Sequence, residues 1–490
     1  MDAIVIGGGH NGLVAAATLA RLGHSVGVFE QRERFGGVAD GLLHDTQSLS
    51  PEVVSELNLS SHGLKLQDPA PVFVPSREGH GLLLHRDPDL AAEELGADAE
   101  PYRNWRAFLD RVLPFARAQL DRTAPDVRGD APLWPLLKTG MAFRRLGKKD
   151  IHELLRVGPA CVDDYLSEWF TSPLLKTALA APALHGTFMG SRSPTSTATL
   201  LLHEAQISKE VIGGAPALVE ALVEACRAGG VELQAGAEVR RIRVVGGRAV
   251  GVELADGSSV DAGTVLSCIG PRRTLLDLVP PEKLPVGTAG HIRKVRVRGT
   301  LARLTLKLTG PIEYACRPGF APERSLIAEH PLDLERAFDH VKHRRMPTDP
   351  PLDIRQSDGE ASVLVRCAPF ELEGGWTDAR RSELTESVLV SLERYAPDVR
   401  SVATVTEALT PTDLAQRYAL EGGHEMHGEL ALDQLGPMRP GLELSRYSTS
   451  IAGLFCGSAG IHPGGGISGR PGRLAALAGS DRVSRALPRP

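Results

Sequence analysis

The chain opens with a short apolar run that leads directly into a glycine-rich turn. Residues 2–6 read "DAIVI", a continuously apolar stretch typical of a buried parallel strand. "GGGHNG" follows, then the helical stretch "LVAAATLARLG", and a second apolar run over residues 24–30 ends in Glu30. This order of strand, glycine turn, helix, strand and acid predicts an α/β unit that binds a dinucleotide.

Each glycine of this motif, and the acid that follows it, is required for a physical reason. Gly7 lets the chain turn tightly, Gly9 lets the backbone approach a pyrophosphate, and Gly12 lets helix and strand pack closely. The start of the helix presents free N–H groups to phosphate oxygens. Glu30 follows at the distance where a carboxylate accepts hydrogen bonds from ribose hydroxyls.

The residues after the acid indicate which dinucleotide is bound. "QRERFGG" places Arg32, Gly36 and Gly37 in the flavoprotein pattern E-x-R-x-x-x-G-G. This resemblance implies that Arg32 and the paired glycines hold the ADP part and the pyrophosphate of FAD, and we include Gln31 among the contacts. Val38 stands where the pattern usually has an arginine.

The tail repeats the glycine spacing in "GLFCGSAGIHPGGGISGRPG", residues 453–472, at Gly464, Gly466 and Gly469. A second dinucleotide site would need a strand running directly into its first glycine, but residues 461–463 intervene. It would also need an acid roughly 20 residues later, and none is present. We therefore predict one site completed by both ends of the chain, and no NAD(P) site.

Composition narrows the class of protein. The net charge is −5, from 55 basic and 60 acidic residues, which gives no reason to expect nucleic-acid binding. The 6 cysteines show no C-x-x-C spacing, which fits a reducing compartment. No signal peptide and no apolar run of roughly 18 residues is evident. We expect a cytoplasmic protein.

The middle of the chain supplies further elements. Residues 212–230 predict a loop and an amphipathic helix, and residues 231–270 predict strands joined by turns at Gly246-Gly247 and Asp256-Gly257. "HIRKVRVR", residues 291–298, predicts a strand with one wet face.

These stretches together resemble the phytoene desaturase-like FAD oxidoreductases, in particular the branch named pyridine-nucleotide-disulphide-oxidoreductase-domain-protein two. The resemblance runs from end to end. The sequences that carry it are "VIGGGHNGLVAAATLARLGHSVGVFEQRERFGG", "SPTSTATLLLHE", "IGGAPALVEAL", "LTPTDLAQRYALEGGHEMHGELALDQL" and "GLFCGSAGIHPGGGISGRPGRLAA".

The resemblance implies an α/β fold. A Rossmann-like FAD-binding domain of the glutathione reductase and amine oxidase type carries an inserted α+β substrate domain. The FAD-binding domain is discontinuous, over residues 1–70, 205–280 and 406–490. The substrate domain takes residues 71–204 and 281–405.

The resemblance also implies individual cofactor contacts. Val239 lies by the adenine, and a helix that begins near Gly466 points its N–H groups at the flavin. Gly464, Gly465, Gly466 and Ile467 line the isoalloxazine and the ribityl chain, and Gly457 is a further cofactor contact.

Side-chain candidates for catalysis are few. His462 and Arg470 flank the tail glycines and are the best candidates for orienting a ligand, with a structural loop histidine as the alternative for His462. His185 faces either the substrate cavity or the core. His424 and His427 lack a third ligand, so we expect no metal.

Two further features can be explained by ordinary packing as well as by a functional role. Cys456 lies in a predicted buried strand, so core packing is expected rather than a covalent flavin link, and FAD is expected to be noncovalent. Residues 131–149 mix apolar and basic side chains. They suit a half-buried helix with a solvated basic end, or a helix in peripheral contact with a membrane.

The leading hypothesis is an FAD-dependent oxidoreductase that takes hydride from a C–C or C–N bond of a small, largely apolar substrate, with oxygen or quinone as electron acceptor. One alternative is a flavin-dependent isomerase or saturase that uses reduced FAD. Another is a binding protein like the Rab escort and GDP-dissociation-inhibitor proteins. A flavin monooxygenase is disfavoured by the missing "GD" motif, and a monoamine oxidase-like role by the aromatic-poor tail.

Overall fold

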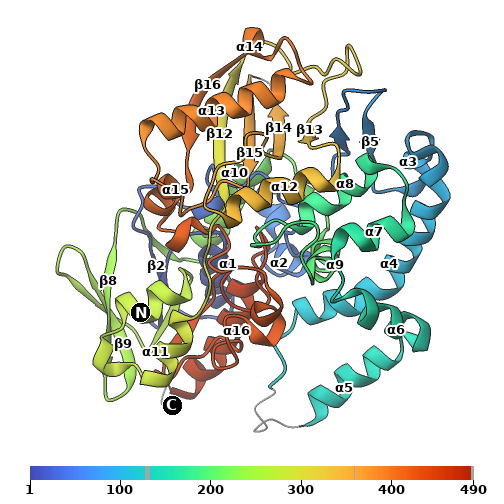
Figure 1. Ribbon diagram of the computed structural model, residues 1–490. Coiled ribbons are helices and arrows are strands. Elements are labelled where there is room, and N and C mark those ends of the chain that lie inside the picture. The colour runs from blue at the N-terminus through green and yellow to red at the C-terminus, as the bar shows by residue number, and fades with distance from the viewer. Residues whose placement is uncertain (127–132, 358, 487–490) are drawn as a thin grey trace.

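A computed structural model describes residues 1–126, 133–357 and 359–486 of the chain (Figure 1). The N-terminal motif folds as its sequence predicts, with β1 (Ala3–Ile6), α1 (His10–Arg21) and β2 (Val26–Phe29) in that order. Gly7 has φ +92°, a conformation that favours glycine. A Cβ atom on Gly12 would lie 1.9 Å from the Gly7 carbonyl oxygen, so the close approach of helix and strand needs glycine there.

The motif belongs to a parallel sheet with the strand order β17-β11-β1-β2-β7. Its strands come from the start, the middle and the end of the chain, and every neighbouring pair is parallel. Helix α1 packs against both α10 and α16. The further bounds are β7 (Glu232–Gln234), β11 (Thr264–Ser267), β17 (Leu454–Cys456), α10 (Gly214–Ala228) and α16 (Arg470–Ala486).

A small antiparallel sheet packs beside this parallel sheet through β9, which contacts β11. Its hairpin turns fall at Gly246-Gly247 and at Asp256-Gly257, as the sequence predicts. The strands are β8 (Val239–Val245), β9 (Arg248–Leu254) and β10 (Ser259–Asp261), and a separate short pair is β3 (Leu66–Gln67) with β6 (Glu210–Val211).

A mixed sheet in the order β16-β12-β15-β14-β13-β4-β5 forms the other half of the molecule, drawn at the top of Figure 1. Strand β16 crosses the predicted domain limit at residues 405/406, and the domain limits themselves stay a prediction. The strands are β4 (Val72–Val74), β5 (Leu82–Leu84), β12 (Leu301–Leu308), β13 (Arg324–Ile327), β14 (Leu352–Ser357), β15 (Glu360–Arg366) and β16 (Ala403–Leu409).

Helices of the region 88–206 lie to the right of the parallel sheet in Figure 1, beside and below β5 of the mixed sheet. They are α3 (Pro88–Leu95), α4 (Ala99–Leu120), α5 (Leu133–Arg144), α6 (Gly147–Val157), α7 (Val162–Trp169), α8 (Pro173–Ala183) and α9 (Ser196–Gln206). The remaining helices are α2 (Pro51–Glu56), α11 (Val286–Arg293), α12 (Pro331–Lys342), α13 (Asp378–Glu393), α14 (Val399–Val402) and α15 (Pro411–Tyr418). Over the described ranges, no helix is both long enough and apolar enough to cross a lipid bilayer.

Two sequence-based expectations are wrong. Residues 291–298 form no strand, because α11 extends to Arg293 and the chain then runs without regular structure. The buried residues there are Ile292 and Val295, three apart, which is a helical spacing and not the alternation of a strand. The tail helix α16 begins at Arg470 and not near Gly466, because Gly469 adopts φ +71° immediately before it.

Candidate active site

The first glycine turn forms one wall of a pocket at the carboxyl ends of β1 and β2, which we call the nucleotide pocket. Ligand sites of open α/β sheets lie at this edge. It contains most of the predicted FAD contacts from the first half of the chain. The residues that line it include Gly7, Gly9, His10, Asn11, Glu30, Gln31, Arg32, Gly37, Glu238, Val239, Arg273, Tyr418, Glu425 and His427.

Glu30 is fixed by the backbone around it. Its side chain is 6% exposed, one carboxylate oxygen accepts a hydrogen bond from the Gly8 N–H at 2.7 Å, and the other accepts from the Arg32 N–H at 2.9 Å. Each carboxylate oxygen accepts more than one hydrogen bond. The carboxylate is therefore oriented by the protein and still able to accept from ribose hydroxyls.

The second glycine pair closes over the first turn. The Gly36 N–H donates to the Gly8 carbonyl at 2.8 Å, and a Cβ on Gly37 would lie 3.0 Å from the Gly9 Cα. Arg32 is held by protein partners, with Nη2 at 3.0 Å from Asp40 Oδ2. Gly36 itself does not line the pocket, so its role is the turn, at φ +115°.

The tail glycines lie against the N-terminal helix. A Cβ on Gly472 would lie 2.0 Å from the Asn11 carbonyl oxygen, and one on Gly469 would lie 3.0 Å from Val14 Cγ2. The backbone of Gly466 lies near enough to His10 to raise its pKa, although burial has the larger, opposite effect. Both glycine clusters are therefore parts of one continuous region, and the tail does not form a separate Rossmann unit.

A second pocket, which we call the tail pocket, is bounded on one side by Gly465 and Gly466. Much of its wall is apolar, from Leu43, Pro182, Ala183, Leu202, Ile207, Leu364, Met426 and Leu430. Its polar wall comprises Asp45, Gln47, Ser48, His185, Thr199, His203, Gln206, Arg324, Asp353 and Arg366.

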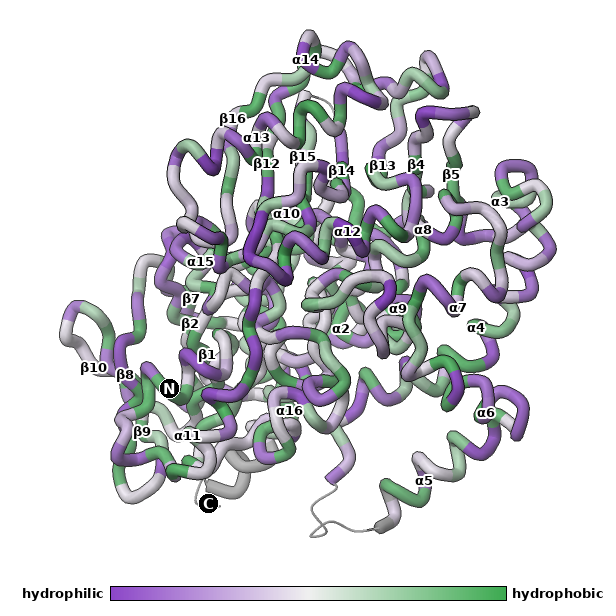
Figure 2. Tube along the Cα trace, viewed as in Figure 1, coloured by the Kyte–Doolittle hydropathy of each residue, from purple (hydrophilic) through white to green (hydrophobic). Residues whose placement is uncertain are grey.

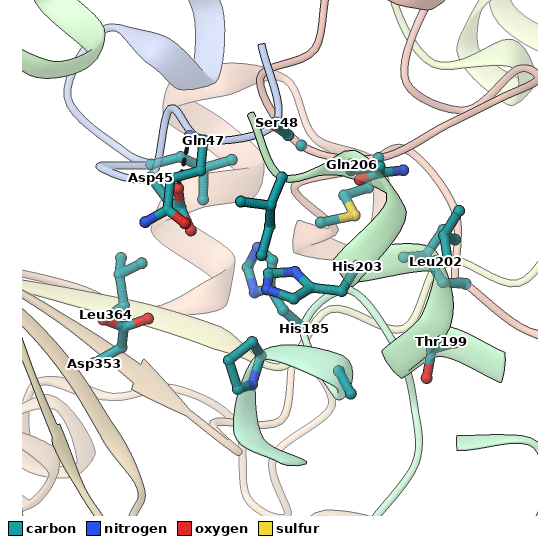
Figure 3. A pocket seen from close by; sticks show the side chains of 18 of the residues that line it. Asp45, Gln47, Ser48, His185, Thr199, Leu202, His203, Gln206, Asp353 and Leu364 are labelled. Carbon is teal, nitrogen blue, oxygen red and sulfur yellow. Dashed lines mark hydrogen bonds between the residues drawn. The ribbon is translucent and has the colours of Figure 1, made fainter. Parts of the chain in front are cut away.

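Figure 3 shows the imidazole rings of His185 and His203 in the middle of the tail pocket, with Asp45 and Asp353 to one side and Gln206 to the other. Burial, together with the nearby positive charge of Arg366, lowers the pKa of His185 to about 4. Burial also lowers the pKa of His203. Both histidines are therefore neutral near pH 7, as hydrogen-bonding groups without charge.

His462 and Arg470 anchor the tail loop to the end of α4. His462 Nε2 lies 3.0 Å from the Arg122 carbonyl oxygen, and Arg470 Nε lies 2.7 Å from Asp121 Oδ1. Arg470 also donates to the Ser48 carbonyl at 3.0 Å, and it lines an open cleft that shares Gln206 with the tail pocket. Neither residue lines the tail pocket itself.

The other predicted residues either line one of the two pockets or are buried away from both. His185 lines the tail pocket, and His427 lines the nucleotide pocket. Gly464 and Ile467 are buried within the tail loop and line neither pocket. Gly457 packs in the core, where a Cβ would lie 2.8 Å from Ala475 Cβ. Cys456 is fully buried beside it on β17, as expected for core packing.

Sequence reasoning missed the polar and charged wall of the tail pocket. Asp45, His203, Arg324, Asp353 and Arg366 come from separate segments with no common spacing. His10, in contrast, stands inside the "GGGHNG" turn, and this position could have identified it as a residue of the nucleotide pocket.

The residues present fit the ADP part of FAD. In the nucleotide pocket, His10 Nε2 and Asn11 Oδ1 are buried and have no hydrogen-bond partner among the residues described. They lie at the N-terminus of α1, where helix N–H groups favour phosphate oxygens. Glu30, Gln31 and Arg32 line the same pocket.

Comparison with known proteins agrees with this geometry. Residues 5–54 match the NAD(P)-binding Rossmann-like domain, and residues 77–443 match the flavin containing amine oxidoreductase family. Pyridine nucleotide-disulfide oxidoreductase domain-containing protein 2 of Rattus norvegicus is 30% identical, over 97% of this chain and 92% of its own length. The lycopene-forming phytoene desaturase of Paracoccus sp. is 26% identical, over 97% of this chain and 96% of its own.

A crystal structure of an oxidoreductase from Methanosarcina mazei superposes with a TM-score of 0.59 at 15% identity, over 98% of this chain and 99% of that one. At this identity the likeness shows the fold alone. The chain belongs to the flavin containing amine oxidoreductase family, within the phytoene desaturase-like FAD oxidoreductases. It is an FAD-dependent oxidoreductase with a Rossmann-like FAD-binding domain.

Proposed function

We propose that this oxidoreductase removes hydride from a C–C or C–N bond of a small, largely apolar metabolite that binds in the tail pocket. The observation that carries the proposal is the apolar wall of this pocket, which meets the tail glycines at Gly465 and Gly466. Bound FAD supplies a hydride acceptor. The chain's own contribution is to hold the substrate C–H bond in place and to exclude water.

The side chains act by binding and positioning in this proposal. His185 and His203 supply neutral hydrogen-bonding groups, because burial lowers the pKa of each. His462 and Arg470 hold the tail loop against the end of α4, and so act on the substrate through the position of the loop. The electron acceptor in this proposal is oxygen or a quinone.

A flavin-dependent isomerase or saturase remains a second candidate, since it needs the same pockets. The two are distinguished by mixing the purified protein anaerobically with candidate substrates. Loss of flavin absorbance in one turnover supports dehydrogenation. Conversion of substrate only after prior chemical reduction of the flavin supports the alternative. The absence of bound flavin in pure protein would contradict both and support an escort-like role.

Peripheral membrane contact through α5 is a separate proposal. Among its described side chains, Trp134 is 66% exposed and Leu137 is 54% exposed. Figure 2 shows hydrophobic segments along α5 at the edge of the molecule. Lys138 follows Leu137 directly, and Arg144 is the last residue of the helix. Residues 131 and 132 of the predicted stretch lie outside the described residues.

Anionic lipid vesicles test the proposal by co-sedimentation. Exposed apolar area and basic charge together strengthen binding to such a surface. We expect the wild-type protein to sediment with vesicles that contain phosphatidylserine, and the Trp134→Ser/Leu137→Ser variant to stay in solution. Equal recovery of both proteins in the supernatant would contradict membrane contact through α5.

A further inference from the structure

Arg366, the last residue of β15, holds two hydrogen-bond donors that have no acceptor. It lines the tail pocket and also an adjoining pocket that includes Leu184, Leu301 and Phe338. Its side chain is 13% exposed, and its Nη2 lies 3.0 Å from Asp353 Oδ2. Nε and Nη1 are buried and have no hydrogen-bond partner among the described residues. A buried donor without an acceptor destabilises the folded protein, so an acceptor is expected in the pocket.

The position of Arg366 is fixed by the sheet. Asp353 lies on β14, which pairs with β15 in antiparallel register, and it is buried beside the guanidinium. The residue after Arg366, Cys367, has φ +69°, which is uncommon for a residue other than glycine. Backbone in this region is retained where the surroundings require it, often at binding sites. The free donors therefore belong to a rigid part of the pocket.

The charges around Arg366 are already balanced. Arg324 Nη2 lies 3.4 Å from Asp45 Oδ2 and 3.7 Å from Asp353 Oδ2, so the pocket holds two guanidinium groups and two carboxylates. The positive charge of Arg324 lowers the pKa of Asp45. The pKa of Asp353 is well below its usual range for the same reason. A further anion would find no unbalanced positive charge here.

Two neighbours make an anion still less favourable. Glu425 Oε1 lies 3.7 Å from His185 Nε2, and the pKa of Glu425 is lowered despite its burial, with the charge of Arg366 among the causes, so it stays ionised near pH 7. His185 is neutral near pH 7, so it offers no positive charge to an anion. A cationic amine fails for a different reason, because its N–H groups would face the N–H groups of Arg366.

We propose that Arg366 binds an uncharged oxygen acceptor, such as a ketone or ester carbonyl, on an otherwise apolar substrate. This inference rests on the proposed function, since it takes the tail pocket as the substrate site. The carbonyl oxygen satisfies the free donors without adding charge, and the apolar wall takes the hydrocarbon part. Arg366 is thus a specificity-determining residue that selects for a carbonyl group.

Ligand binding tests the inference directly. The FAD-bound protein is titrated in a calorimeter with methyl octyl ketone, decane, decanoate and decylamine, which share a hydrocarbon chain and differ in the polar group. A hydrogen bond from a charged donor is worth about 1.5–3 kcal/mol, so we expect the ketone to bind about tenfold tighter, or more, than each of the others. Equal affinities for ketone and decane, or a preference for decanoate or decylamine, would overturn the inference.

Two variants and a control assign the effect to the side chain. Arg366→Leu should bind ketone and decane equally, while Arg366→Lys should keep part of the preference because it retains a donor. Arg303→Gln removes another half-buried arginine, which lines a different pocket and donates to Ser362, and it should keep the full preference. A ketone preference that survives in Arg366→Leu would refute the role of Arg366.

The outcome is separable from the proposed function. Wild-type titrations remain decisive if an Arg366 variant fails to fold. If an apolar substrate reduces the flavin but the titrations show no preference for the ketone, this inference is wrong and the proposed function is unaffected. A ketone preference that depends on Arg366, with no flavin reduction by any ketone or hydrocarbon offered, would support the binding role and count against hydride removal.

Discussion

Replacing Glu30 by glutamine changes one atom of the side chain and reverses one hydrogen-bonding role. The carboxylate accepts from the Gly8 N–H at 2.7 Å and from the Arg32 N–H at 2.9 Å. A glutamine keeps one acceptor oxygen and turns an NH₂ group toward the other backbone N–H. These two backbone hydrogen bonds exist with and without FAD, so they do not set the affinity. The affinity falls because the neutral amide replaces the charged acceptor of the ribose hydroxyl, and one hydrogen bond to a charged acceptor is worth about 1.5–3 kcal/mol. The Kd for FAD should therefore rise about tenfold to a hundredfold.

The assay is titration of flavin-stripped protein with FAD, followed by quenching of flavin fluorescence. Glu30→Arg should abolish binding, because a donor replaces the ribose acceptor. Glu33→Gln is the matched control, since Glu33 is exposed three residues further on and does not line the nucleotide pocket. An unchanged Kd in Glu30→Gln, or an equal loss in Glu33→Gln, would refute the assignment of Glu30 as the ribose acceptor.

Three further predictions follow from the pockets. NADH and NADPH should reduce the bound flavin slowly or not at all, and rapid, saturable bleaching would contradict the absence of an NAD(P) site. His462→Ala and Arg470→Ala should slow flavin reduction by substrate in stopped flow while FAD stays bound, and wild-type rates in both would remove their positioning role. Burial lowers the pKa of His10 and His185 to about 4 and of His427 to about 3. Between about pH 6.5 and pH 4 the unfolded chain binds more protons than the folded one, so the unfolding temperature should fall as the pH falls through this window.

Local patterns made the N-terminal half of the site predictable. Gly7 is required by a tight turn, and Gly12 by the close approach of helix and strand. Glu30 is required as a hydrogen-bond acceptor. Each requirement restricts a single position, so it can be recognised in the sequence. The tail glycines were assigned to the same site because no strand leads into them, and the contact between Gly472 and Asn11 agrees with that.

Predictions failed where tertiary packing overrides a local pattern. The alternation over residues 291–298 suggested a strand, but Ile292 and Val295 are buried at helical spacing. The wall of the tail pocket could not be predicted, because Asp45, Arg324 and Arg366 meet only after separate segments fold together. These side chains balance one another's charge only in the folded protein, and no regular spacing in the sequence indicates that they are neighbours.

The ratio of FAD to protein chain tests the central claim most directly. The account predicts a yellow protein that carries one FAD per chain, since both glycine clusters serve a single cofactor. Acid precipitation should release all of the flavin into the supernatant, where its absorbance is compared with the protein concentration. Two flavins per chain, none at all, or flavin that stays with the precipitated protein would contradict the account.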